Sequence, residues 1–262
     1  MGETGGVVKV HAPAKLTVSL RITGVRANGY HELDAEMVTL SLADELVLDE
    51  GGTGLTIEGD GWTRADELER MEDNLVGKAL AACGRRAAVR LRKRVPLGAG
   101  LGGGSADAAA ILRWAGATDP ALAARLGADV PFCVAGGRAR VGGVGERVTP
   151  LEFERRDYLL LLPPFGVDTA AVYLAWDRAP AHDGPNELAA AALAVEPRLA
   201  RWRDGLGDLV GSEPRLAGSG STWFAEGGPA EAGTPDAPEL RVGAESGRLV
   251  RVHTVPAGWE GD

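Results

Sequence analysis

The stretch that decides the fold runs from Pro96 to Ala109 and reads PLGAGLGGGSADAA. An alternating strand over residues 89–95 precedes it, and an apolar helix over residues 105–114 follows it. The run between them offers backbone with almost no side chains, so several N–H groups can surround one anion at the start of a helix. The order of strand, glycine loop and helix therefore predicts a phosphate-binding loop.

Two other nucleotide-binding loops make different demands on the neighbouring residues. A Walker loop needs lysine and then serine or threonine at its end, but here Ser105 directly follows Gly104. The spacing Gly98-Ala-Gly100-Leu-Gly-Gly103 matches a dinucleotide fingerprint, yet the strand before it carries arginine at every second position instead of being apolar throughout. The flanking residues favour neither of these loops.

Upstream of the loop, the segment from Val8 to Ile22 alternates, with every even-numbered position apolar. This period predicts a half-buried strand whose polar face carries Lys15, Thr17 and Ser19.

An Asn-Gly turn at residues 28–29 follows this strand. The runs after the turn read as further strands of an antiparallel sheet: 33–40, 45–48 and 55–58. A charged stretch over 63–73 reads as a solvated connection. Asn74 then stands at the N-cap position of a helix with apolar residues at helical spacing.

The pattern of residue types along the chain changes beyond Pro150. This change places a domain boundary near residue 155 and predicts lobes of 1–155 and 156–262. The elements expected in the second lobe are an apolar run at 158–162, a helix near 169–177, an alanine-rich helix from Asn186, a Gly/Pro/Ala-rich loop over 227–238 and a last strand near 249–255.

The composition limits the class of protein. The chain has 262 residues, 45% of them hydrophobic, with a net charge of -9 and a pI near 5.1. Such an acidic protein lacks the positive field that nucleic-acid or anionic-membrane binding needs, so neither partner is expected. No signal peptide or membrane span is recognisable, and the cysteines Cys83 and Cys133 lie in apolar stretches. We therefore expect a cytoplasmic protein with reduced thiols and no zinc site.

At the glycine loop the sequence becomes similar to a known family. The form Pro-x-Gly-x-Gly-Leu-Gly-Gly-Gly-Ser resembles the second motif of the GHMP kinases, as found in the diphosphocytidyl-methylerythritol kinases. Four other stretches, in family order, resemble further motifs: Ala12-Pro-Ala-Lys15-Leu16, Gly29-Tyr30-His31, Leu126-Gly-Ala-Asp129-Val-Pro131-Phe and Ala217-Gly-Ser-Gly220-Ser. Two positions depart from the family pattern, because Thr17 replaces an asparagine and Ala99 replaces a loop glycine.

The resemblance implies an α+β fold in two lobes, an N-terminal ribosomal-protein-like lobe and a C-terminal ferredoxin-like lobe, with both ligands in the cleft between them. It implies transfer of the γ-phosphate of ATP, with Mg²⁺, to the 2-hydroxyl of a cytidyl-bearing alcohol on the non-mevalonate route to isoprenoid precursors. Asp129 would be the general base, and Lys15 would keep it ionised and stabilise the developing alkoxide. A turn or cap aspartate and a surface lysine are the alternatives for these two residues.

The resemblance also places the nucleotide. The loop residues expected around the phosphates are Pro96, Gly98, Gly100, Leu101, Gly102, Gly103, Gly104 and Ser105, with Ser105 as the protein oxygen nearest Mg²⁺. Asn74 and Lys93 are expected near the adenine. A plain helix cap and a member of a basic strand face remain the alternatives for those two.

The matching substrate residues are Tyr30 and Tyr173, which would stack on cytosine, His31, which would bind its edge, and Thr17 and Thr169. The Tyr30-His31 pair favours the cytidyl substrate over that of another GHMP kinase, of homoserine or mevalonate type. A catalytically silent sensor of the same fold is the rival from another class, and retention of Lys15 and Asp129 argues against it. The protein is expected to act as a monomer or homodimer.

Overall fold

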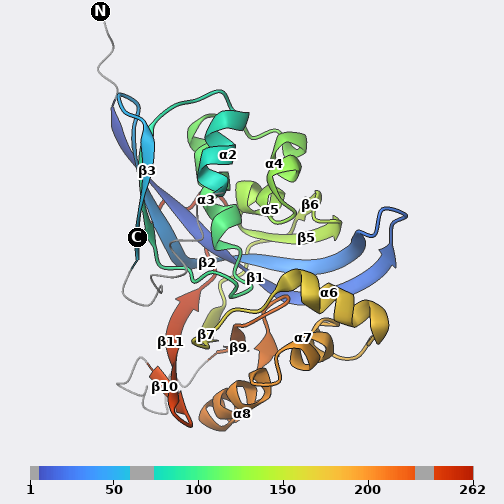
Figure 1. The fold of residues 1–262 in the computed structure, drawn as a ribbon. Helices are drawn as coiled ribbons and strands as arrows, with labels where there is room; N and C mark the ends of the chain where they lie inside the picture. The colour runs from blue at the N-terminus through green and yellow to red at the C-terminus, as the bar shows by residue number, and fades with distance from the viewer. Residues whose placement is uncertain (1–5, 60–73, 228–238, 262) are drawn as a thin grey trace, which may run out of the picture.

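The computed structural model describes residues 6–59, 74–227 and 239–261. The connection expected over 63–73 and residues 228–238 of the expected loop lie outside the described residues. Within them, the chain mixes helices and strands in two lobes, which confirms the α+β class (Figure 1).

The first lobe is built on a sheet whose strands are β1 (Val7–Val25), β2 (His31–Asp49), β3 (Gly54–Gly59), β4 (Ala88–Lys93), β5 (Arg138–Gly143) and β6 (Arg147–Pro150). β2 pairs along its length with β1 on one side. On the other side its first half pairs with β5 and its second half with β4. All of these pairs are antiparallel, as expected, but β3 and β4 run parallel. The two runs expected at 33–40 and 45–48 are one continuous strand.

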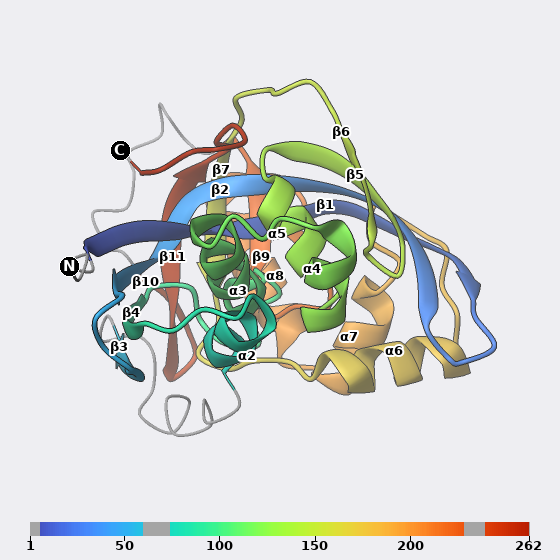
Figure 2. The ribbon, with the colours of Figure 1, turned by 90° about the horizontal axis from the view of Figure 1, so that it is seen from above.

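Four helices cover one face of this sheet: α2 (Leu75–Ala82), α3 (Gly103–Trp114), α4 (Pro120–Leu126) and α5 (Val130–Ala135) (Figures 1 and 2). α3 lies at the centre of this layer, since it contacts α2, α5 and β1. Its residues from Ala106 to Leu112 are all buried, and most are alanine, so neighbouring backbones can approach closely. α4 and α5 were not expected from the sequence.

The second lobe holds a five-stranded sheet in the order β10-β11-β7-β9-β8. Its strands are β7 (Asp157–Leu162), β8 (Arg215–Leu216), β9 (Trp223–Glu226), β10 (Glu239–Val242) and β11 (Glu245–His253). Helices α6 (Thr169–Arg178), α7 (Ala189–Val195) and α8 (Leu199–Val210) lie to one side of it (Figure 1). The first sheet ends at Pro150 and the second begins at Asp157, on either side of the boundary expected from the sequence.

The two sheets share an apolar core. Leu16 and Leu40 of the first sheet pack in one cluster with Leu160 and Phe224 of the second, and all four are fully buried. The C-terminal segment adds main-chain contacts, because Val255 N donates to Thr39 O at 2.9 Å. The position of one lobe against the other is therefore set by packed side chains and by backbone hydrogen bonds.

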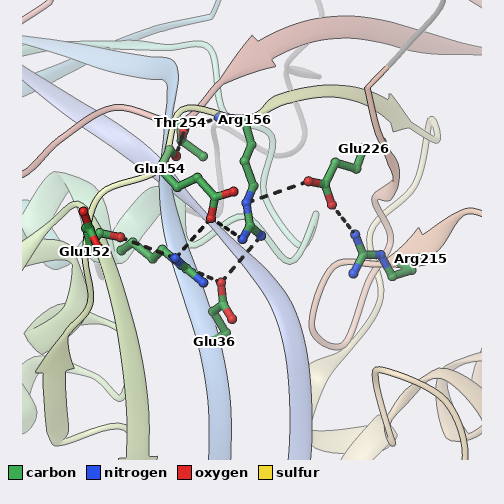
Figure 3. A network of polar contacts seen from close by, with 8 residues as sticks. Glu36, Glu152, Glu154, Arg156, Arg215, Glu226 and Thr254 are labelled. Carbon is green, nitrogen blue, oxygen red and sulfur yellow. Dashed lines mark hydrogen bonds and ion pairs between the residues drawn. The ribbon is translucent and has the colours of Figure 1, made fainter.

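Arg156, in the connection between the sheets, lies at the centre of a polar network (Figure 3). Its guanidinium is 2.6 Å from Glu154, 3.7 Å from Glu36 of β2 and 3.8 Å from Glu226 of β9. The hydrogen bond to Glu154 is the largest cause that holds the Arg156 pKa above its usual value. One cation thus links an acidic side chain of each sheet.

The helices that the structure describes include none that is both long enough and apolar enough to cross a membrane. Both cysteines are free thiols, and burial raises the pKa of Cys133 to about 12, so this thiol stays protonated.

Candidate active site

Strand β1 carries Lys15 and Thr17 into the centre of the molecule by means of two irregularities. The pairing with β2 shifts register between Pro13 and Lys15 and again between Thr17 and Ser19. The first shift places two extra residues in β2 and the second places one extra residue in β1, and the buried residues of β1 change from one face to the other at these two points. Lys15 and Thr17 consequently share a face with Ala12, Leu20 and Ile22, which pack toward the helices, while Ala14, Leu16 and Val18 face the second sheet. The expectation of one apolar and one polar face is wrong here, because both faces are covered.

Lys15 and Asp129 form the ion pair that the sequence suggested. Lys15 Nζ lies 3.3 Å from Asp129 Oδ2 and 3.1 Å from Thr17 Oγ1. The lysine is buried, whereas the aspartate side chain is 31% exposed. Asp129 stands at the N-cap of α5 but makes no side-chain cap hydrogen bond, so its carboxylate serves the lysine and the cavity instead of the helix.

The glycine loop lies directly against this pair. Gly98, Gly100 and Gly102 have φ angles of 64°, 76° and 66°, which side chains rarely allow. A Cβ on Gly102 would lie 2.8 Å from Lys15 Cγ, and Lys15 N donates to Leu101 O at 3.0 Å. The positive φ angles therefore favour glycine at all three positions, and at Gly102 the close approach of the lysine also requires it.

The loop delivers unsatisfied N–H groups to the start of α3. The first hydrogen bond at this end of the helix runs from Ala106 N to Gly102 O, so the helix itself uses none of the N–H groups of residues 103–105. No side chain caps this terminus, and its first turn has no acidic residue. Three donors and the helix dipole are thus available to an anion.

These elements surround one cavity of about 730 Å³, a volume within the range of small-molecule sites. The predicted site residues that line it are Lys15, Thr17, Tyr30, His31, Pro96, Gly98, Gly100, Gly102, Gly103, Gly104, Ser105, Asp129, Thr169 and Tyr173. Residues far apart in sequence, from both lobes, therefore meet at one place.

Two of the predicted substrate residues, His31 and Tyr173, contact each other in the lining of the cavity. His31 stacks on Tyr173 with ring centroids 4.7 Å apart, and its Nε2 lies 2.7 Å from Asp177 Oδ1. Burial raises the pKa of the Tyr173 phenol, and the Asp129 charge adds to this, so the phenol stays neutral. Tyr30 is 63% exposed at the rim and makes no ring contact within the described residues.

Three predicted nucleotide residues do not line the cavity. Asn74 caps α2, accepting from Val76 N at 2.8 Å, and Leu101 is buried in the core between the sheets. Lys93 has no exposed surface, so its side chain has no access to a nucleotide. The place near the adenine came from the family resemblance, and the alternative of a basic strand face is wrong as well, because Arg90 and Arg92 of β4 are exposed whereas Lys93 points into the core.

Lys93 instead belongs to a buried cluster beneath the loop. Its ammonium contacts Asp44 and lies 2.8 Å from Asp107 Oδ2, and all three side chains are fully buried. Asp44 also accepts from Arg94 N and Val95 N at 2.5 and 2.8 Å, but Asp107 Oδ1 has no partner. Burial is the main cause that raises the Asp107 pKa to about 7, and the Asp44 charge adds to it.

Two further residues that line the cavity were not predicted from the sequence: Asp177, which orients His31, and Ser219, whose hydroxyl lies 2.8 Å from that of Thr169. Asp177 had a detectable signal, because it follows Tyr173 by four residues on the same face of a predicted helix. Ser219 lies within the third glycine motif, but no residue of that motif was assigned a role from the sequence.

Comparison with known proteins gives a consistent result. Residues 74–137 match the family model described as the GHMP kinases N terminal domain. The chain is 37% identical over 237 residues to a 4-diphosphocytidyl-2-C-methyl-D-erythritol kinase of Paracoccus denitrificans, covering 81% of this chain and 84% of that one. It is 36% identical over 247 residues to that of Ruegeria pomeroyi, with 83% and 88% covered.

Solved structures agree. A crystal structure of a 4-(cytidine 5'-diphospho)-2C-methyl-D-erythritol kinase matches with a TM-score of 0.65 and 35% identity, covering 83% of this chain and 89% of that one. The crystal structure of an L. major mevalonate kinase in complex with R-mevalonate matches with a TM-score of 0.61 at 12% identity, covering 97% of this chain and 98% of that one, which shows a shared fold only.

The buried cluster gives a testable pH dependence of stability. The folded-state pKa of Asp107, about 7, lies above the ordinary aspartate value of 3.8, so the folded protein binds one more proton than the unfolded chain between these values. Stability from this group is complete below about pH 4 and is lost as the pH rises toward 7. Asp107→Asn should remove this dependence, so its stability relative to the unsubstituted protein should rise across that window by up to about 4 kcal/mol.

Urea unfolding at pH 4.5, 6 and 8 measures this difference. Asp208→Asn, at an exposed carboxylate of α8, is the control and should show no comparable trend. A constant offset of Asp107→Asn across the three pH values would mean that Asp107 remains ionised in the folded protein.

Proposed function

The chain belongs to the family of 4-diphosphocytidyl-2-C-methyl-D-erythritol kinases within the GHMP kinases, and is an ATP-dependent small-molecule kinase; from this premise we propose that its acceptor is the 2-hydroxyl of 4-diphosphocytidyl-2-C-methyl-D-erythritol. The reaction would serve the non-mevalonate route to isoprenoid precursors. The observation that carries the proposal is the Lys15–Asp129 pair, 3.3 Å apart, beside the loop that offers free N–H groups.

In this proposal Asp129 accepts the proton of the acceptor hydroxyl. Its carboxylate has exposed surface in the cavity and no capping bond to satisfy. Lys15 stabilises the carboxylate charge before transfer and the alkoxide charge as it develops. The lysine can do both because the ammonium has three donors, and Thr17 and Asp129 use two of them.

The glycine loop holds the phosphates of ATP. The N–H groups of residues 103–105 and the positive end of α3 face the cavity without competing side chains. Phosphoryl transfer needs alignment and charge stabilisation more than covalent help, so this cradle with one acid-base pair is a sufficient set. The acceptor attacks the γ-phosphorus directly, and no phosphorylated enzyme forms.

Mg²⁺ fits the residues present. No group of three or more His, Cys, Asp or Glu that could hold a metal occurs in the part of the chain that the structure describes. Mg²⁺ bound mainly by nucleotide phosphates and water needs no such group, and the Ser105 hydroxyl in the cavity would be its protein ligand. When bound, the ion neutralises charge on the phosphates.

Tyr30, His31 and Tyr173 would bind the cytosine, and Asp177 would hold the His31 ring in place against Tyr173. Tyr30 reaches the rim of the cavity with 63% of its surface exposed, so a base could cover it at little cost. We further propose that the protein acts in the cytoplasm, as a monomer or homodimer without a nucleic-acid partner, in keeping with its net charge of -9.

A substrate panel tests the function. The protein, with Mg²⁺ and ATP, should phosphorylate the cytidyl substrate and leave homoserine and mevalonate at background, as measured by coupled ADP release. No label from γ-labelled ATP should remain on the denatured protein. Comparable turnover of homoserine or mevalonate would overturn the substrate assignment, and absence of any turnover would favour a silent sensor.

Asp129→Asn tests the acid-base role. The amide keeps the shape of the side chain but cannot accept the proton, so kcat should fall about 10²- to 10⁴-fold. Both ligands should still bind, as calorimetry can show. Turnover within about tenfold of the unsubstituted protein, with binding intact, would make Asp129 a structural residue.

Tyr30→Ala tests the cytosine site. Loss of a stacking face costs roughly 1–3 kcal/mol, which corresponds to about a five- to 150-fold rise in KM for the cytidyl substrate. KM for ATP and the melting temperature should hardly change, because the side chain is exposed. Tyr30→Phe keeps the face and is the matched control. Equal damage to both KM values would show that Tyr30 has no specific part in cytosine binding.

A further inference from the structure

The segment from Pro185 to Leu188 belongs to the second lobe and contacts strand β1 of the first lobe beside the cavity. It is part of none of the sequence motifs and has no role in the proposed mechanism. It docks on β1 through main-chain hydrogen bonds: Leu20 N donates to Pro185 O at 2.8 Å, and Glu187 N donates to Leu20 O at 3.0 Å. The buried Glu187 carboxylate adds a bond from Ile22 N at 2.9 Å. The segment is thus fixed to the strand that carries Lys15.

Asn186, at the centre of this segment, binds the third glycine motif. Its side chain is 5% exposed, and its amide Nδ2 donates to Leu216 O at 2.9 Å and to Gly218 O at 2.7 Å. Its Oδ1 accepts from Leu188 N at 3.0 Å. Both amide protons are used on carbonyls of one short loop, so the direction of those carbonyls depends on this side chain.

The direction of the Gly218 carbonyl decides where the next N–H points. In a trans peptide the C=O and the N–H point in opposite directions, and the Gly218–Ser219 peptide is trans. Since the Gly218 carbonyl points to Asn186, the Ser219 N–H points away from it. This N–H has no hydrogen-bond partner among the described residues, and both Gly218 and Ser219 line the cavity.

The peptide that carries this N–H begins at Gly218, which lies close to Lys15. A Cβ built on Gly218 would be 3.6 Å from Lys15 Nζ and 3.7 Å from Thr17 Oγ1. The same loop also touches the phosphate loop, because a Cβ on Gly100 would be 2.2 Å from Ala217 O. A backbone donor beside an ammonium and a phosphate cradle suits an anionic oxygen.

We propose that Asn186 is a positioning residue, which turns the Gly218–Ser219 peptide so that the Ser219 N–H faces the cavity beside Lys15 as a donor to an oxygen of the transferred phosphoryl group. The proposal deepens the kinase function above and rests on it. Asn186 itself touches no ligand and acts only through this peptide.

Asn186→Asp tests the proposal at constant size. A carboxylate cannot donate, and it repels the two carbonyls, so the peptide should rotate and the N–H should leave the cavity. Loss of one preorganised donor costs about 10²- to 10³-fold in kcat. We expect a fall of at least tenfold in kcat, with the calorimetric affinities for ATP and the acceptor within threefold of the unsubstituted protein.

Glu187→Gln is the matched control in the same segment. It keeps an oxygen for Ile22 N and makes no contact with the glycine motif. It should leave kcat within threefold even where the melting temperature falls. A kcat for Asn186→Asp that stays within threefold, or that falls only in proportion to both affinities and the folded fraction, would overturn the proposal.

Replacement of Ser219 by its α-hydroxy acid, which changes only the N–H to an ester oxygen, provides a test that leaves Asn186 untouched. It should lower kcat as Asn186→Asp does, and an unchanged kcat would overturn the proposal even where Asn186→Asp does not fold. All ratios are taken on whichever alcohol the unsubstituted protein phosphorylates. A wrong assignment of the acceptor would therefore be revealed by the substrate panel with the unsubstituted protein, and it would not alter the kcat ratios between the variants and that protein.

Discussion

The approach of three backbone segments with no room for side chains between them is the constraint on which the rest of the site depends. Gly100 of the phosphate loop meets the Ala217 carbonyl, and Gly102 meets the Lys15 stem, at distances that a Cβ would not allow. This contact brings donors from the start of α3, an ammonium from β1 and a loop of the second lobe to one point. Since the segments come from both lobes, the shared core of Leu16, Leu160 and Phe224 is a condition of the active geometry as well as of stability.

Two buried lysines near this point show how burial can serve different ends. Lys93 has no exposed surface and contacts two carboxylates, so its charge interacts with groups inside the protein and not with a ligand. Lys15 has a single carboxylate at 3.3 Å and a hydroxyl, and it lines the cavity. Because an ammonium carries three donors, Lys15 keeps one for a ligand. The difference follows from register: the shifts in β1 turn Lys15 toward the cavity, whereas β4 ends with Lys93 directed into the core.

The two-lobed α+β fold and the proximity of Lys15 to Asp129 were predicted through the resemblance to a known family, since no local pattern joins two residues so far apart in the sequence. The order of strand, glycine loop and helix was predicted from local patterns and is confirmed, whereas phosphate binding by the loop stays a prediction. The faces of β1 were predicted wrongly, since alternation alone carries no sign of the register shifts at Pro13–Lys15 and Thr17–Ser19. The burial of Lys93 was missed because it depends on Asp44 and Asp107, which are distant in sequence. Asn186 was seen only as the start of a helix, since its partners at Leu216 and Gly218 are brought near it by the fold.

The net charge of -9 is at first sight unfavourable for a protein that binds ATP and a diphosphate. The site resolves this locally, because free N–H groups at residues 103–105 and a helix dipole attract anions without adding net charge. Such donors are effective only when the backbone is held rigidly, since a loop free to rotate would turn its carbonyls toward the phosphate as readily as its N–H groups. In this protein the glycine contacts and the Asn186 amide hold the backbone of the site in place, so under the proposed function the attraction of the site for phosphate would depend on packing as much as on charge.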